Sequence, residues 1–162
     1  MTTFDDGIRV KGTIRADSIP LPANSVGSTQ FSAADPLAVS KQVHQYVQTY
    51  QQDHGAVVAT KTSGIHIAQG DGTVEEFKAA LKTANIGAAT VTVDLKKNGT
   101  TVLSATADLD SGDAAYAVVS GTISTAAYSA GDVFEVLVTA TAGGGTLGQG
   151  LTVILVVNED QA

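Results

Sequence analysis

Cysteine and tryptophan are both absent from this chain of 162 residues, and only 5% of its residues are aromatic. Without cysteine there is no disulfide framework, no thiol chemistry and no zinc site built on thiolates. A hydrophobic content of 43% with so few rings predicts a core of valine, leucine, isoleucine and alanine, and the 17 glycines predict many turns. This composition favours a single β-domain with an appendage.

Long apolar runs are missing too, and no stretch approaches the roughly 20 apolar residues of a membrane-spanning helix. The first residues lack the basic and apolar regions of a signal peptide. The net charge of −7 argues against nucleic acid as a partner, because phosphate binding needs a basic surface. No lysine or arginine follows Leu103, whereas seven acidic residues do. We therefore expect no membrane and no nucleic-acid partner, and a chain with three basic residues near its beginning, Arg9, Lys11 and Arg15, and an acidic distal half.

Residues 35–54 are predicted to form a short helix, around which the rest of the chain is organised. Asp35 is a suitable N-cap, Pro36 suits the first helical position, and Gly55 follows the helix as a glycine often does. Such a short helix must bury its apolar stripe, either on its own domain or against other copies. The second alternative predicts a stalk, and we expect a trimer. The stripe, and the predicted oligomer interface, consists of Val39, Val43, Tyr46, Val47 and Tyr50.

Residues 1–34 precede this helix as a predicted extended arm. Apolar and basic side chains alternate in it with the period of a strand that has one apolar face. Further on, Ile19-Pro20-Leu21-Pro22 forces an extended backbone. Because the arm has no core of its own, we expect it to dock on a neighbouring chain. The alternating residues, which form the predicted docking segment, are Ile8, Arg9, Val10, Lys11, Ile14 and Arg15.

Residues 55–162 are predicted to form the main domain. Their patterns indicate short strands at 56–60, 65–68, 114–119, 133–140 and 151–157, with a turn at 62–64 and the last strand central. One helix interrupts them: Thr73-Val74-Glu75-Glu76 spells a capping box, followed by an apolar stripe of Phe77, Leu81 and Ala84 that Asn85 and Gly87 end. The predicted fold is mainly β, an antiparallel sandwich or jelly roll with one flanking helix.

Residues 89–109 are predicted to form a hairpin around Asn98-Gly99. A two-residue loop would place Leu103 opposite Asp94, a core residue across from a charge. A three-residue loop that includes Lys97 pairs Val93 with Leu103 instead and keeps one face apolar. The three-residue loop is therefore expected.

Catalytic, cofactor and metal sites are not indicated by any pattern in the chain. The histidines are His44, His54 and His66, and no serine lies in a Gly-x-Ser-x-Gly elbow. His66 could meet its copies on a symmetry axis and bind a metal or anion, but a surface or hydrogen-bonded histidine is the simpler interpretation. Residues 108–113 lack the EF-hand order and indicate an acidic turn. Residues 145–150 join two strands and are no nucleotide fingerprint.

The order of these features resembles small virion surface proteins of tailed bacteriophages, namely trimeric head-decoration (cement) proteins and head or tail fibres. The resemblance implies a non-enzymatic structural role, a homotrimer, and an arm that docks onto the major capsid protein at the outer surface of the head. It transfers no active-site residue. The segments that carry it are Gly7–Pro22, Lys41–His44, Gly72–Phe77, Val91–Gly99 and Ala130–Val133.

Two other functions stay open from the sequence. The first is a head or tail fibre component whose sandwich binds host surface carbohydrate. Sugar sites usually stack on exposed aromatic rings, and the distal half offers Tyr116, Tyr128 and Phe134. The second is a hydrolase on a jelly-roll scaffold, which no residue pattern indicates.

Overall fold

The computed structural model describes residues 43–160, of which only the backbone is described at Val43. These residues form antiparallel strands and no helix, so the prediction of a mainly β, sandwich-like domain is confirmed and the flanking helix is wrong. The strands are β1 (Val43–Gln51), β2 (Lys61–Ile67), β3 (Gly72–Thr83), β4 (Thr90–Lys97), β5 (Thr100–Thr101), β6 (Leu103–Ala105), β7 (Ala107–Leu109), β8 (Val118–Ser120), β9 (Thr122–Ile123), β10 (Ala127–Tyr128), β11 (Val133–Thr141) and β12 (Gln149–Asp160).

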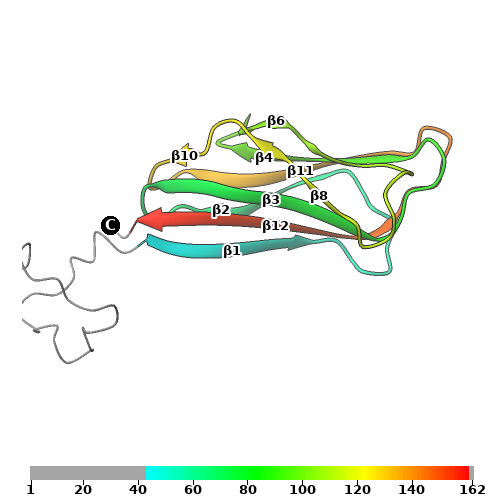
Figure 1. Ribbon diagram of the computed structural model, residues 1–162, viewed down its shortest axis with the longest axis horizontal. Coiled ribbons are helices and arrows are strands. Elements are labelled where there is room, and N and C mark those ends of the chain that lie inside the picture. The colour runs from blue at the N-terminus through cyan, green and yellow to red at the C-terminus, as the bar shows by residue number, and fades with distance from the viewer. Residues whose placement is uncertain (1–42, 161–162) are drawn as a thin grey trace, which may run out of the picture. The chain divides into compact units, whose positions relative to one another are not determined.

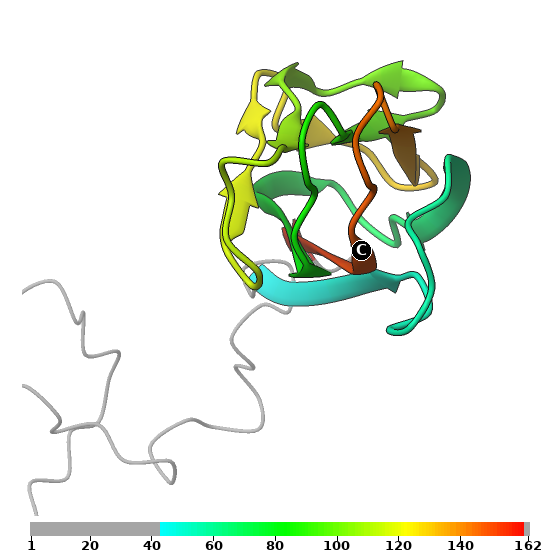
Figure 2. The same ribbon diagram turned by 90° about the vertical axis from the view of Figure 1, so that its right-hand side faces the viewer.

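Two main sheets face each other, and a small third pair joins β6 to β9. The first sheet has the order β1-β12-β3-β10, with β8 also on β3; the second has the order β2-β11-β4-β5, with β7 also on β4. The pairing is nested, because the first strand pairs with the last, the second with the one before it, and the third with β10. Figure 1 shows β1, β12 and β3 side by side, and in the end-on view of Figure 2 β1 lies along one margin of the sandwich.

The core lies between the two sheets and is aliphatic, as the composition predicted. Phe77 and Phe134 are its two largest fully buried side chains, and leucines and valines fill the rest. Alternate residues of β11 and β12 point inward, because the side-chain period of a strand is two. The fully buried inward residues of these two strands are Phe134, Val136, Val138, Leu151, Val153, Leu155 and Val157.

The predicted helix over residues 35–54 is wrong where the structure describes it, because Val43–Gln51 form strand β1. Valine and tyrosine both favour extended backbone, and pairing with β12 over nine residues outweighs a helical spacing of apolar side chains. In the strand, Tyr46 and Val47 point to opposite faces. The chain then turns at residues 53–56, where the Asp53 carboxylate accepts a hydrogen bond from the Gly55 amide at 2.8 Å. The sandwich therefore begins before residue 55.

The predicted helix from Thr73 to Gly87 is wrong as well, since Gly72–Thr83 form β3, which pairs with β12. The predicted stripe was ambiguous, because a spacing of four between Phe77 and Leu81 fits a helix face and one face of a strand equally well. The strand also contains an irregularity. Val156 of β12 pairs with Glu76 and Val157 with Val74, so Glu75 is an extra residue in β3. This β-bulge changes the inward spacing from two to three between Val74 and Phe77. The buried positions Val74, Phe77 and Leu81 then have the spacing of a helix face although the backbone is extended.

The hairpin after β4 has a two-residue loop rather than the predicted three-residue loop. Lys97 pairs with Thr100, and the loop residues Asn98 and Gly99 both have positive φ, 49° and 81°, as a type I′ turn requires. The pairing of β5 with β4 ends after Thr101. The chain pairs with β4 again only at β7, where Ala107 lies opposite Val93. This excursion restores the apolar face without a longer loop.

The remaining strand predictions fare unevenly. The strands predicted at 133–140 and 151–157 are confirmed as β11 and β12, and β12 lies between β1 and β3 in its sheet. Residues 56–60 contribute only a bridge from Val57 to Gln149, and the turn predicted at 62–64 lies inside β2. Of the strand predicted at 114–119, only the last two residues belong to β8.

Candidate functional site

A buried carboxylate organises the end of the sandwich at which β1 begins and β12 ends. Glu159 lies on the inward face of β12 and is only 2% exposed. Its Oε1 accepts hydrogen bonds from the amides of Gln69 (2.8 Å) and Gly70 (2.9 Å), and its Oε2 accepts one from His66 Nε2 at 3.1 Å. Two backbone amides and an imidazole thus compensate for the desolvation of the carboxylate, and they tie the β2–β3 loop to the last strand.

Aromatic rings from both sheets form a continuous row beside this carboxylate. The His66 ring lies between Tyr46 of β1 and Phe134 of β11, with ring centroids 6.2 and 6.1 Å away. Tyr128 meets Phe134 edge to face at 5.2 Å, and His44 stacks on Tyr46 at 6.4 Å. His66 is therefore a hydrogen-bonded histidine, as the simpler interpretation of the sequence held.

Tyr128 closes the cluster from the β10 side. Its hydroxyl donates a hydrogen bond to the Asn158 carbonyl at 3.0 Å and lies 3.4 Å from Glu159 Oε2. Burial and the neighbouring Glu159 charge raise the pKa of the Tyr128 phenol well above its ordinary value. The strand beside it must have glycine at residue 72, because a Cβ there would meet the Asn158 carbonyl and come within 2.5 Å of the Tyr128 hydroxyl.

The raised pKa of Tyr128 predicts a loss of stability in alkali. Above about pH 10 the tyrosine of the unfolded chain releases its proton while the folded one keeps it. The unfolded state then binds fewer protons, so the free energy of unfolding falls with pH, by at most about 1.4 kcal/mol per pH unit from this group. Urea unfolding between pH 8 and 11 should show this slope reduced in Tyr128→Phe. Tyr116→Phe, at a residue 65% exposed, should keep the wild-type slope; equal slopes in both variants would contradict the assignment.

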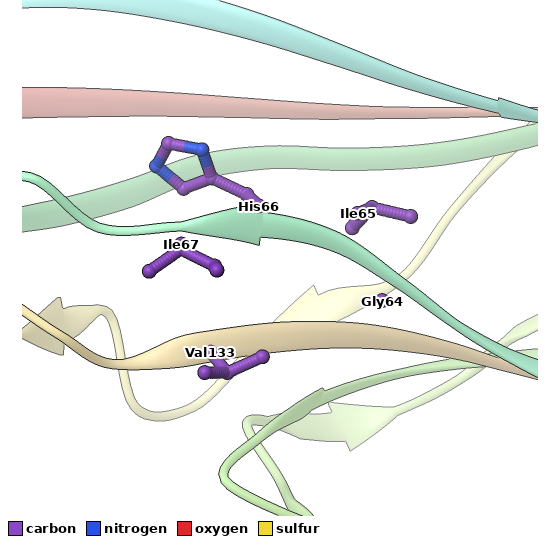
Figure 3. A pocket seen from close by; sticks show the side chains of 5 residues that line it. All are labelled: Gly64, Ile65, His66, Ile67 and Val133. Atoms are coloured by element: carbon purple, nitrogen blue, oxygen red, sulfur yellow. The ribbon is translucent and has the colours of Figure 1, made fainter.

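A shallow hollow of about 350 Å³ lies along β2 and is lined by Gly64, Ile65, His66, Ile67 and Val133. Figure 3 shows His66 turned to one side of the strand, and Ile67 and Val133 turned to the other. The pairing of β2 with β11 shifts between Phe134 and Glu135, which makes Ile65 an extra residue, and Gly64 has no side chain to fill the space. The wall is aliphatic apart from His66, whose Nε2 already donates to Glu159.

The predicted oligomer interface lies on β1 as far as it is described. Val47 is 58% exposed on the outer face, Tyr46 lies at the margin, and Tyr50 packs partly against the core. Val39 lies outside the described residues, as does the whole predicted docking arm from Ile8 to Arg15. The strand thus brings Tyr46 and Tyr50 to one face and Val47 to the other, instead of to one helical seam.

The acidic turn predicted at residues 108–113 is found at residues 110–113, whereas Asp108 and Leu109 belong to β7. The Asp110 carboxylate accepts a hydrogen bond from the Gly112 amide at 2.6 Å, and the Asp113 carboxylate accepts one from the Asp110 amide at 2.9 Å. Among residues 43–160 no group of three or more acidic or histidine side chains could hold a metal ion. The same residues contain no helix long and apolar enough to cross a membrane.

No known protein family and no curated protein matches this chain.

Sequence reasoning missed two buried polar residues, Glu159 and Asn85. Asn85 donates a hydrogen bond to the Leu109 carbonyl at 2.8 Å and accepts one from the Gly148 amide at 2.7 Å, so it joins three loops at the opposite end of the domain. A signal for Glu159 was present, because it follows Leu151, Val153, Leu155 and Val157 at the inward parity of β12. A charged side chain at an inward-facing position of β12 is buried and therefore needs hydrogen-bond or ionic partners.

Proposed function

We propose that this chain is a non-enzymatic structural virion protein, a head-decoration or cement protein that binds the assembled head as a homo-oligomer and stabilises it. Its partner would be the major capsid protein, and its place the outer surface of the head. The predicted trimer stays a prediction, although the helical stalk that suggested it is replaced by a strand over residues 43–51.

The nested strand pairing supports a jelly roll in this proposal. In a jelly roll two four-stranded sheets form by pairing the first strand with the last and the second with the one before it, as β1 with β12 and β2 with β11 do here. Viral capsid and lectin domains commonly use this arrangement. A fold by itself hosts many functions, so the argument needs a surface as well.

The observation that carries the proposal is the contrast between the described domain and the segment before it. Residues 43–160 contain five lysines and twelve acidic residues, whereas the preceding segment has four basic and four acidic residues, and its Arg9, Lys11 and Arg15 alternate with apolar residues. An extended segment that adds to a neighbouring sheet gains main-chain hydrogen bonds over its whole length. Several such arms on one oligomer add avidity. The acidic domain would face solvent and keep particles apart.

Stabilisation of the head follows from linkage. A ligand that binds the assembled shell and not the separate subunits shifts the equilibrium toward the shell. Heads that carry this protein should therefore resist heat or low ionic strength better than heads without it.

Removal of residues 2–34 should abolish binding to heads and leave a folded domain. The measurement is co-sedimentation with heads that lack the protein, together with a thermal unfolding curve of the truncated chain. A full-length variant with Arg9, Lys11 and Arg15 changed to serine tests whether the charge of the arm matters apart from its length. It should bind heads at least about 10-fold more weakly, because each lost contact to an acidic surface removes about 0.5–1 kcal/mol of binding free energy. Binding that survives the truncation would exclude the docking arm.

The alternative, a fibre component that binds host carbohydrate, has one residue in its favour. Tyr128 and Phe134 are buried, but Tyr116 is exposed and has a positive φ of 63°, a conformation rare for tyrosine. A ring held in this way could stack on a sugar. Glycan-array binding that Tyr116→Ala removes would favour this function over decoration.

A further inference from the structure

One edge of β1 has no partner strand among residues 43–160, and its sequence is unusual for such an edge. The strand is nine residues long, pairs with β12 on one side without a register shift, and has no strand on its other side among residues 43–160. It contains no charged residue, no proline and no glycine. Proteins normally protect such edges with charge, proline or a bulge, because an exposed edge is a template for pairing with another chain.

The neighbouring edge strand, β2, has features that protect its edge against pairing with another chain. It is the edge of the second sheet, on the same side as β1, since Tyr46 and His66 contact each other across the gap. It contains Lys61 and Gly64, and its pairing with β11 is interrupted by the extra residue Ile65. The contrast indicates that the β1 edge is kept open for a partner.

The backbone groups that face the open edge follow from the β12 pairing. The Gln52 amide donates to the Leu151 carbonyl at 2.9 Å in the same register as β1, so the even-numbered residues of β1 exchange hydrogen bonds with β12. In an antiparallel pair these positions alternate, so the odd-numbered residues point their N–H and C=O groups outward. They are Val43, Gln45, Val47, Thr49 and Gln51.

We propose that β1 pairs with β1 of a second copy, antiparallel about a two-fold axis at Val47. Val47 is the middle residue of β1, so an axis there pairs the largest number of outward-pointing residues in the two strands. Val47 then lies opposite the partner's Val47, and Gln45 opposite the partner's Thr49. The two first sheets join into one continuous sheet. This pairing stands independently of the virion assignment, and it gives a pair of chains in place of the trimer.

The side chains of β1 suit self-pairing. A charge at or near the axis would face its own copy, and like charges directly opposite destabilise a sheet. The uncharged sequence avoids this conflict. The pairing also brings together the two Val47 side chains, each 58% exposed in the single chain, and β-branched residues favour cross-strand contact.

Cysteine substitution tests the register directly, because the natural chain has no cysteine. Opposed residues in hydrogen-bonded positions have Cα atoms about 5.5 Å apart, within the roughly 4.4–6.8 Å that a disulfide spans. Val47→Cys in the full-length protein should therefore form a covalent dimer on mild oxidation. Thr49→Cys is the matched control, since its two copies would lie about 13 Å apart and should stay reduced.

A mixture of Gln45→Cys and Thr49→Cys proteins should again give a covalent dimer, because the register places these two residues opposite each other. Native mass spectrometry or non-reducing gels measure the yield, with unfolding curves to show that each variant is folded. Val47→Cys that crosslinks no more than Thr49→Cys would overturn the proposal. A monomeric wild-type protein would also overturn it, because the edge would then be unoccupied or covered by the chain's own N-terminal segment. A trimeric wild-type protein would overturn it as well.

Discussion

Replacement of Glu159 by alanine should lower the free energy of unfolding by about 4 kcal/mol, because it leaves one buried and two partly buried hydrogen-bond donors without an acceptor. The Gln69 and Gly70 amides lose their partner at Oε1, and His66 loses its partner at Oε2. The loss should be visible in urea or thermal unfolding of the full-length protein.

Two other glutamate variants define this effect. Glu76→Ala removes an exposed ion pair with Lys78 at 2.7 Å and should cost less than about 1 kcal/mol. Glu159→Gln keeps an oxygen that can accept from the two amides. Its free energy of unfolding should lie between those of Glu159→Ala and Glu76→Ala. A Glu159→Ala protein as stable as Glu76→Ala would mean that the carboxylate does not hold this end of the sandwich.

Asn85→Ala should cost about 3 kcal/mol, since it removes two buried hydrogen bonds and leaves the Leu109 carbonyl and the Gly148 amide unpaired. The effect should extend to the loop before β12, where the Gly148 carbonyl accepts from the Val58 amide at 3.0 Å. Amide hydrogen exchange would report this as faster exchange at Val58.

Gln69→Ala is the matched control for an amide side chain, because it keeps the backbone amide that bonds Glu159. The Gln69 side chain makes an exposed hydrogen bond of 3.1 Å to the Ile67 carbonyl, so its removal should change stability by less than about 0.5 kcal/mol. If the two variants are equally stable, Asn85 is not a structural link between the loops.

The fold class and two central strands could be predicted from their local apolar patterns. The apolar residues of β11 alternate with a period of two, whereas residues 151–157 of β12 are apolar on both faces, as expected of a central strand. β3 could not be predicted, because Thr73–Glu76 spells a capping box and a spacing of four between Phe77 and Leu81 fits a helix face as well as one face of a strand. The bulge at Glu75 depends on the partner strand, which the local sequence does not contain.

β1 was missed for a different reason. Its apolar residues, Tyr46, Val47 and Tyr50, fit a helical seam as well as a strand, and the residues before it begin with good helix-start signals. Pairing with β12 decided between the two, and pairing at a distance of more than a hundred residues leaves no local trace. In the strand, Val47 lies on the outer face and Tyr46 and Tyr50 lie on the opposite one, so the described part of the predicted interface does not form a single seam.

Sedimentation of the full-length protein tests most directly whether this domain is built for self-assembly through β1. The wild type should sediment at about twice its chain mass of 16.4 kDa. Val47→Lys, which places two like charges at the axis, should sediment as a monomer. Ile154→Lys adds the same charge to the outer face of the central strand β12 and should stay paired. A wild type of 16.4 kDa at every concentration, or a pair that Val47→Lys leaves intact, would contradict assembly through this edge.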